Sequence, residues 1–214
     1  MTLLLKIDPE NPDAGKLAEA VLALRGGGGV AFPTETLYGL GADARNETAV
    51  EKIFRIKGRD FRNPIALIVS NDREVIPLVE EIPAAAQILM KTFWPGPLTL
   101  VFRASAAVLP RLTADTGKIG IRVSGHPLAR LLAEGMAGPL TATSANLSGG
   151  PECSSADEVI RVLGDLPDAV IDCGKTPGGA GSTILDVTVF PPRILREGAI
   201  PHSLILSALP RTEG

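Results

Sequence analysis

The amino-acid sequence predicts an α/β protein built around a mixed sheet. Short apolar runs that suit buried strands interleave along the chain with segments whose apolar residues recur at helical spacing. The last predicted strands are joined by short connections, which favours some antiparallel pairing. At 214 residues the chain suits one domain, and its low aromatic content of 4% leaves aliphatic side chains to fill the core.

Strands and helices alternate through the first half of the chain. Leu17, Val21 and Leu24 recur on one face of a predicted helix, which the glycines at 26–29 end. Asn46 is a suitable cap for the next helix. Strands are predicted at 3–7, 30–34 and 65–69, and helices at 13–25, 46–57, 72–80 and 83–92.

The second half continues with more strands and fewer helices. Pro127 is placed to open one helix, and Ser155 with Glu158 forms a capping-box pattern for another. Residues 1–200 form the predicted domain, and residues 201–214 a loosely held tail. Strands are predicted at 98–102, 119–123, 140–143, 169–173, 183–187 and 193–197, and helices at 127–134 and 155–163.

Composition argues against several classes of protein. No apolar run approaches the roughly 20 residues that span a bilayer, and the N-terminus lacks the basic start and cleavage site of a signal peptide. The two cysteines, Cys153 and Cys173, argue against a disulfide scaffold or a zinc knuckle, and as free thiols they fit the cytoplasm. A net charge of −3 argues against a protein built mainly to coat nucleic acid.

Motifs for covalent or metal catalysis do not occur in the sequence. His126 and His202 are the two histidines, no HExxH or cysteine–histidine ligand spacing is present, and no GxSxG turn supports a hydrolase triad. The remaining side chains favour a site that positions substrates and neutralises charge.

Two glycine-containing stretches favour different interpretations. The glycines at 26–29 follow a helix and open a strand, the reverse of a phosphate-binding turn, so we favour a helix C-cap. In FPTETLYGLGADA (32–44), the TET triplet at 34–36 follows a predicted strand, and two glycines come soon after. Either these hydroxyls orient a polar ligand that the glycines allow to approach, or they cap a turn.

The stretch KGRDFR (57–62) places a cation where the helical pattern calls for an apolar residue. Val50 and Ile53 belong to the apolar stripe of the helix, and Lys57 is a later position on it. Departures from a local pattern concentrate at functional sites, and an anion would offset the cost of a desolvated ammonium. We therefore favour an anion site formed by Lys57 and Arg59, with phosphate as the ligand, over a lysine that extends to solvent.

Polar and charged residues recur at the ends of other predicted strands. Arg122 lies inside the otherwise buried strand 119–123 and needs a partner or a ligand, and Arg196 stands at the end of a late strand. Hydroxyl and amide side chains gather at two further strand ends, namely Thr141, Thr143, Ser144, Asn146, Ser148, Ser182 and Thr183. Because ligands of α/β sheets bind at strand ends, these residues predict one shared site.

These motifs, in this order, resemble a known family. PTETLYGLGADA, KGR, NP, FWPGPLTLVF, GIRVSGHP, TSANLSG, GSTILDV and ILREG occur between about residues 12 and 200 in the order of the YrdC-like domain. This is the L-threonylcarbamoyladenylate synthase family, and the chain is similar to its short form, which has no further C-terminal domain. The resemblance implies a twisted sheet of parallel and antiparallel strands, with helices on its faces and an open, concave, basic face.

The resemblance also implies an enzyme of the nucleotidyltransferase class. In that family L-threonine, bicarbonate or carbon dioxide, and ATP give threonylcarbamoyl-AMP and pyrophosphate, with Mg²⁺ bound mainly through the triphosphate. Other proteins then transfer the threonylcarbamoyl group to an adenosine of tRNA, and whether the synthase itself makes a weak contact with tRNA is an open question. A cytoplasmic location is implied by this role.

Roles for individual residues follow from the same resemblance. It implies that Lys57 and Arg59 are the catalytic pair at the ATP phosphates. Because the mixed anhydride hydrolyses easily, water must be kept out, and our candidate for the cover is the glycine-rich segment 174–182. Threonine contacts are implied for Thr34, Arg122, Thr141 and Ser182, and nucleotide contacts for Lys57, Arg59, Asn63, Thr143, Ser144, Asn146 and Arg196.

Two positions depart from the family pattern. Many members carry a histidine that helps to bind threonine, and Ile68 stands at that point here. Thr143 takes the place of a common proline. Selectivity between threonine and serine is therefore an open question of the sequence.

Two other functions remain as alternatives at this point. The first is an RNA-binding module, for tRNA or double-stranded RNA, that uses the basic face without catalysis and binds in a salt-sensitive manner. The second is a carbamoyl-adenylate enzyme of hydrogenase maturation, although the zinc-finger and acylphosphatase segments of such chains do not occur in this sequence.

Overall fold

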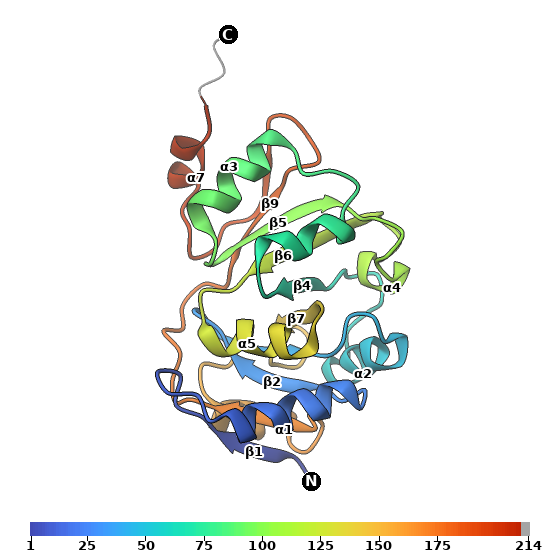
Figure 1. The fold of residues 1–214 in the computed structure, drawn as a ribbon, viewed down its shortest axis with the longest axis vertical. Coiled ribbons are helices and arrows are strands. Elements are labelled where there is room, and N and C mark those ends of the chain that lie inside the picture. Colours follow the sequence, from blue (N-terminus) through green and yellow to red (C-terminus); the bar gives the residue numbers. More distant parts are fainter. Residues whose placement is uncertain (211–214) are drawn as a thin grey trace.

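Ten strands form one mixed sheet in the computed structural model, which describes residues 1–210 (Figure 1). The strands are β1 (Leu3–Lys6), β2 (Val30–Pro33), β3 (Tyr38–Gly41), β4 (Ala66–Val69), β5 (Leu98–Arg103), β6 (Lys118–Val123), β7 (Leu140–Ser144), β8 (Ala169–Asp172), β9 (Thr183–Asp186) and β10 (Arg193–Arg196). They lie in the order β1-β8-β2-β3-β7-β4-β6-β5-β9-β10. The sheet contains parallel pairs, such as β4 with β6 and β5 with β9, and antiparallel pairs, such as β9 with β10. The predicted mixed α/β sheet is confirmed.

Polar caps and glycines define the helices, as their sequences predict. The side-chain oxygens of Asp13, Asn46 and Ser155 each accept a hydrogen bond from a backbone N–H in the first turn of the helix that follows. Gly26 and Gly58 end the first two helices, Gly58 with a left-handed φ of 57°. The helices are α1 (Ala14–Arg25), α2 (Glu47–Lys57), the 3₁₀ helix η1 (Asp72–Leu78), α3 (Ala84–Phe93), α4 (Pro110–Thr113), α5 (Pro127–Met136), α6 (Ala156–Leu163) and α7 (His202–Ala208).

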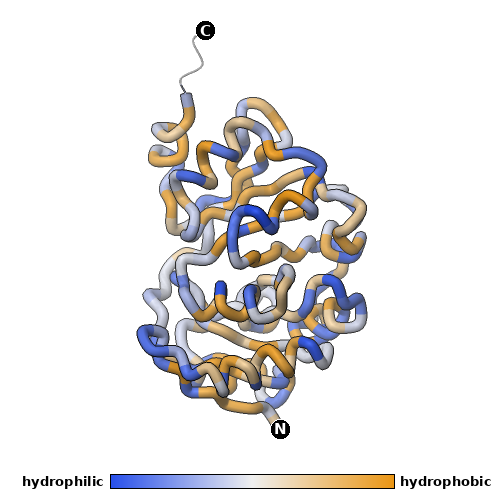
Figure 2. The backbone as a smooth tube through the Cα atoms, viewed as in Figure 1, coloured by the Kyte–Doolittle hydropathy of each residue, from blue (hydrophilic) through white to orange (hydrophobic). Residues whose placement is uncertain are grey.

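Buried apolar side chains form two clusters, one on each face of the sheet. Because successive side chains of a strand point to opposite faces, Phe32 of β2 joins one cluster while its neighbour Ala31 joins the other. In the same way Ile68 of β4 packs in the cluster that contains α1 and α5, and Leu67 packs in the opposite one. Figure 2 shows the resulting pattern, with hydrophobic backbone positions along the interior strands and hydrophilic positions in surface turns.

The strand β3 is an addition to the predicted elements. Its residues belong to the stretch 32–44, for which the sequence allowed two interpretations, a ligand-binding loop or a capped turn. In the structure they pair with β2 and β7. A Cβ on Gly39 would lie 3.2 Å from the ring of Phe32, and one on Gly41 would collide with the carbonyl oxygen of Thr141. The two glycines therefore make room for packing inside the protein. Their weak strand propensity explains why the sequence did not predict β3.

The remaining differences are local. The short helix α4 was not predicted, and residues 72–78 form a 3₁₀ helix that contains Pro77. Glu158 completes the capping pattern one residue early, because its Oε2 accepts from Ser154 N at 2.7 Å and not from the N-cap residue.

Much of the predicted tail is held against the domain. Helix α7 contacts α3, and Ile205 of α7 is 1% exposed (Figure 1). The domain boundary at residue 200 stays a prediction, and residues 211–214 lie outside the described part of the chain. No helix within residues 1–210 is long and apolar enough to cross a membrane, and the cytoplasmic location stays a prediction as well.

Replacing Gly41 by alanine tests the close approach of β3 to β7. The added Cβ meets backbone, which cannot rotate away, so we expect the free energy of unfolding to fall by about 2–3 kcal/mol in urea titrations. Gly15→Ala is the control, because Gly15 lies in α1 and a Cβ there meets only a side-chain oxygen, at 3.2 Å. Alanine in that helix should be neutral or stabilising, by up to ~1 kcal/mol. Equal effects of the two changes would contradict the packing role of Gly41.

Candidate active site

Small side chains on one face of the central strands leave a hollow over the sheet. The strand register places Ala66 of β4, Gly120 of β6 and Ala142 of β7 on the same face as Arg122. Leu67 and Ile121 point to the opposite face, into the core, while Ile68 and Leu140 share the face of Arg122 and pack in the other cluster. The hollow has a volume of about 200 Å³. Side chains this small cannot fill the space above them, so the sheet provides a floor for a ligand.

Polar side chains from several elements line this hollow. They come from the turn between β2 and β3 (Thr34, Thr36), from the segment after α2 (Arg59), from β5 (Thr99), from β6 (Arg122), from the end of β7 (Thr143, Ser144), from the segment before β9 (Ser182) and from β10 (Arg196). The hydroxyl oxygens of Thr99 and Ser182 lie 2.8 Å apart, and Arg196 Nη2 donates to the carbonyl oxygen of Ser182 at 2.8 Å. The edge strand β10 thus reaches the hollow through the segment before β9.

Arg122 is a buried cation with a partner that the sequence did not single out. Its side chain is in contact with Glu35, whose Oε1 accepts from Arg122 Nη1 at 3.3 Å, while Glu35 Oε2 accepts from Ser124 Oγ at 2.5 Å. Burial lowers the pKa of Arg122, and Glu35 opposes this effect. Burial pushes the pKa of Glu35 upward, but Arg122 and Ser124 together outweigh it, so that the pKa lies below its ordinary value. Glu35 is therefore ionised near neutral pH, and the guanidinium of Arg122 keeps its charge as arginine does in proteins.

Lys57 lies behind the hollow and not at its surface. Its side chain is 2% exposed, and Nζ donates to the carbonyl oxygens of Ser144 and Asn146 at 2.5 and 2.8 Å and to Asn146 Oδ1 at 2.9 Å. Three acceptors match the three N–H groups of an ammonium. Burial and then the charge of Arg59 lower the pKa of Lys57 to about 8. The ammonium joins the end of α2 to the loop after β7. All three of its N–H groups already donate hydrogen bonds to protein oxygens.

The other predicted residues divide into those that line the hollow and those beside it. Thr34, Arg59, Arg122, Thr143, Ser144, Ser182 and Arg196 line it, whereas Lys57, Asn63, Thr141 and Asn146 do not. Thr141 is buried and its Oγ1 accepts from Ala42 N at 2.9 Å. Asn63 is exposed in the turn after Arg59, and Asn146 donates to the carbonyl oxygen of Gly150 at 2.6 Å while it accepts from Lys57.

Sequence reasoning missed several residues of the site. Glu35 and Thr36 belong to the TET triplet that was noted, but the triplet alone does not tell which side chain reaches Arg122. Thr99 could have been found by the pattern that identified Arg122, because each is a polar residue inside an otherwise apolar strand. Glu152 lines the rim of the hollow, and nothing in its local sequence pointed to the site. Ile68, at the position of the family histidine, also lines the hollow and is fully buried.

A model of a protein family described as telomere recombination, and named for Sua5, YciO and YrdC, matches residues 22–198. The chain belongs to the Sua5/YciO/YrdC family. It is similar to the threonylcarbamoyl-AMP synthase of Pyrococcus abyssi, with 40% identity over 94% of this chain and 59% of that protein. The synthase of Bacillus subtilis is 41% identical over 89% of this chain and 55% of that protein.

A solved member of the Sua5/YciO/YrdC family supports the same grouping. The crystal structure of P. abyssi Sua5 complexed with L-threonine superposes with a TM-score of 0.94 at 38% identity, over 97% of this chain and 61% of that one. The chain thus spans somewhat more than half the length of these relatives. The predicted family and fold are confirmed, and the basic character of the concave face stays a prediction.

A Lys57→Met substitution tests the role of the buried ammonium. Methionine keeps an apolar stem but removes all three hydrogen bonds that the buried ammonium donates to the Ser144–Asn146 loop, so we expect the free energy of unfolding to fall by about 2–4 kcal/mol. Lys52→Met is the matched control on the same helix, because Lys52 forms a partly exposed ion pair with Asp168 at 2.6 Å. Its loss should cost less than ~1 kcal/mol in the same urea titrations. Similar losses for both variants would mean that Lys57 does not anchor the loop.

Proposed function

We propose that this chain is an L-threonylcarbamoyladenylate synthase. The main support for the proposal is that a buried arginine and two less buried arginines line one hollow. Arg122 is buried and lines the hollow together with Thr34 and Ser182, and Arg59 and Arg196 line the same space. A small amino acid beside a nucleotide requires such an arrangement, because one cation binds the amino-acid carboxylate while others neutralise phosphate. The names of the relatives support the same activity.

The substrates would be L-threonine, bicarbonate or carbon dioxide, and ATP. The amine of threonine attacks the carbon of carbon dioxide and loses a proton, which gives an N-carboxylate. This carboxylate attacks the α-phosphorus of ATP, the bond to the β-phosphate oxygen breaks, and pyrophosphate leaves. The products are threonylcarbamoyl-AMP and pyrophosphate, and no protein nucleophile is required, in keeping with the hydroxyls and cations around the hollow.

The residues singled out from the sequence have distinct roles in this scheme. Arg122 would bind the threonine carboxylate, with Thr34 and Ser182 nearby for its polar groups. Arg59 and Arg196 would stabilise charge that develops on the phosphates, where removal of one such contact typically costs ~2–4 kcal/mol. Lys57, expected from the sequence to contact phosphate, would instead hold the Ser144–Asn146 loop in place, since its three N–H groups already donate to that loop. The nucleotide contacts expected of Asn63, Thr143, Ser144 and Asn146 remain part of the proposal.

Mg²⁺ would enter this site with the triphosphate. Within residues 1–210 no three histidine, cysteine or carboxylate side chains gather in a way that could hold a metal ion. Among the residues that line the hollow, the hydroxyls and the rim carboxylate of Glu152 are the oxygen donors that could face an ion bound to phosphate oxygens. The ion would neutralise charge on the leaving pyrophosphate.

Downstream proteins would consume the product. Threonylcarbamoyl-AMP is a mixed anhydride and hydrolyses readily, so it must be shielded from water and passed to an acceptor adenosine of tRNA by transfer proteins. Residues 174–182 are the proposed cover. Hydrogen bonds hold their backbone at several points, among them Thr176 N to Ser154 O at 2.9 Å, Gly178 N to Thr36 O at 2.8 Å and Ala199 N to Gly181 O at 2.9 Å, and the segment ends at Ser182 in the hollow.

The decisive experiment supplies ¹⁴C-bicarbonate, Mg-ATP and one amino acid at a time, and measures labelled acyl-adenylate and pyrophosphate. The proposal expects both products with L-threonine, and the serine reaction shows how selective the pocket with Ile68 is. Carbamoyl phosphate, tested in place of threonine and bicarbonate, should give no adenylate. Salt-sensitive binding of tRNA without any release of pyrophosphate would instead support the RNA-binding module.

An Arg59→Ala variant should lower the formation of threonylcarbamoyl-AMP by roughly 10²-fold or more, because it removes a cation from the phosphate side of the hollow. Initial rates of pyrophosphate release at saturating ATP measure the effect. Arg62→Ala is the matched control three residues away, since Arg62 is exposed and pairs with Asp60 at 2.6 Å outside the hollow. Near-normal turnover of Arg59→Ala would refute the phosphate role.

Hydrogen exchange tests the cover. Amides of residues 174–182 should exchange several-fold more slowly when ATP and threonine are both bound than with either alone, because closure protects them from solvent. Amides of the β9–β10 connection, residues 187–192, serve as an internal reference. An unchanged rate in 174–182 would exclude this segment as the cover.

A further inference from the structure

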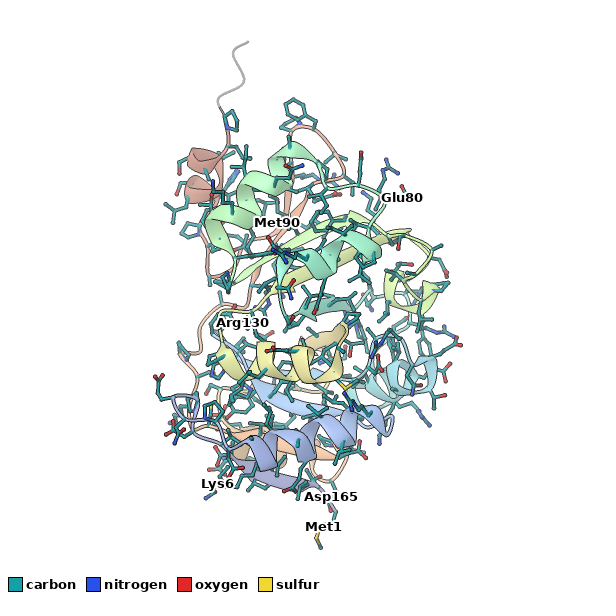
Figure 3. All side chains as sticks on the ribbon, viewed as in Figure 1. Met1, Lys6, Glu80, Met90, Arg130 and Asp165 are labelled. Carbon is teal, nitrogen blue, oxygen red and sulfur yellow. The ribbon has the colours of Figure 1, made fainter. Side chains whose placement is uncertain are left out.

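A second pocket lies between α3 and α5, separate from the hollow. It has a volume of about 650 Å³, and its walls come from η1, α3, the segment after α3, the end of β6 and α5. We refer to it as the α3–α5 pocket and define it by Arg73, Ile76, Met90, Lys91, Trp94 and Arg130. Figure 3 labels two of these residues, Met90 of α3 and Arg130 of α5. No residue lines both this pocket and the hollow.

The α3–α5 pocket has an excess of positive charge in a chain that is negative as a whole. Three cations line it, Arg73, Lys91 and Arg130, against the single carboxylate of Asp72, which leaves a net charge of +2. Within residues 1–210 none of the three cations forms an ion pair. The chain as a whole carries −3. Three cations gathered without carboxylate partners favour an anionic ligand.

Arg130 is the fixed cation of the pocket. It is half-buried, and its Nη1 donates to the carbonyl oxygen of Ser124 at 2.6 Å, which sets the direction of the guanidinium. Among the described residues, the nearby carboxylates do not form ion pairs with Arg130, so its guanidinium is available to a ligand. Both oxygens of Glu74 accept from Ser70, and Glu134, one turn further along α5, lines an adjoining pocket without an ion pair to Arg130 in the described part of the chain.

The other walls of the pocket are apolar and aromatic. Trp94 is half-buried, and its indole is fixed because Nε1 donates to the carbonyl oxygen of Leu98 at 2.7 Å. Ile76 is 64% exposed although it is a large aliphatic residue, and Met90 and Val123 also line the space. A fixed indole beside exposed apolar side chains suits a planar ring.

We propose that the α3–α5 pocket binds a small organic phosphate that carries an aromatic ring, of the size of a nucleoside monophosphate. The ring stacks on Trp94, and the phosphate lies between Arg130 and Lys91. A phosphate monoester carries a charge of about −1.5 to −2 at pH 7, which matches the net charge of the pocket better than a single carboxylate does. Inorganic phosphate would leave the apolar wall unused, and an apolar molecule would leave the cations unused.

The test uses the fact that Trp94 is the one tryptophan of the chain. Its fluorescence therefore reports on the α3–α5 pocket directly, and a base stacked on the indole quenches it. We expect cytidine 5′-monophosphate to quench the full-length protein in a saturable manner. Cytidine, which lacks the phosphate, should bind at least about tenfold more weakly, since a charge-assisted pair is lost. Inorganic phosphate should not quench.

Two variants and a control assign the contacts. Arg130→Gln should weaken cytidine monophosphate at least about tenfold, because glutamine can still donate to Ser124 but carries no charge. Lys91→Gln changes an exposed side chain, so it should weaken binding without any effect on folding. Arg55→Gln is the matched control, an exposed arginine of α2 outside both pockets, and should bind like the unchanged protein.

Binding must also be independent of the hollow. The proposal expects the same quenching in Arg59→Ala and in the presence of saturating L-threonine, because neither changes the α3–α5 pocket. Loss of quenching in either case would place the nucleotide in the hollow and overturn the proposal. So would equal binding by Arg130→Gln and Arg55→Gln, or the absence of saturable quenching. A ribotetranucleotide that binds a hundredfold more tightly than the monophosphate would overturn it too, in favour of an RNA surface.

Discussion

A buried guanidinium near the middle of the sheet constrains the structure around the hollow. Arg122 is 8% exposed, and an isolated charge at such a place costs several kcal/mol, on the order of a whole domain's net stability. The carboxylate of Glu35 offsets this cost by pairing with Arg122, and Ser124 donates a hydrogen bond to the same carboxylate. Glu35 must then be held in one position. The turn between β2 and β3 does this, because Thr34 Oγ1 donates to the carbonyl oxygen of Leu37 at 2.6 Å and closes the turn. The order of residues in the TET triplet is therefore a consequence of the charge on β6.

The same logic explains the loop after β7. Its backbone carbonyls point inward, where unpaired oxygens are costly, and the ammonium of Lys57 satisfies them from the end of α2. Arg59 is then the next cation along the chain and the first that lines the hollow. Two neighbouring cations thus have different surroundings, one serving the protein's own backbone and one facing the open space. The charged pattern of KGR alone does not separate these two roles.

Much of the fold could be predicted from the sequence, because its signals are local. The caps Asn46 and Ser155 and the long apolar strands lie where their patterns place them. The site was harder, since it depends on which face of a strand a residue occupies. Thr141 pairs with Leu67 and so points away from the hollow, while Ala142, one residue later, forms part of its floor. Strand register determines which of these two side chains faces the hollow. It is set by pairing between segments that are distant in the sequence, so the residues around Thr141 do not reveal it.

The spread of the hollow along the sequence also has a consequence for biosynthesis. Its lining begins at Thr34 and ends at Arg196, and β9 enters the sheet beside β5 only after some eighty further residues have been made. A nascent chain on the ribosome therefore has no complete pocket until Arg196 has emerged. Translation that stops before Ser182 leaves a product whose hollow lacks the side chains of both Ser182 and Arg196.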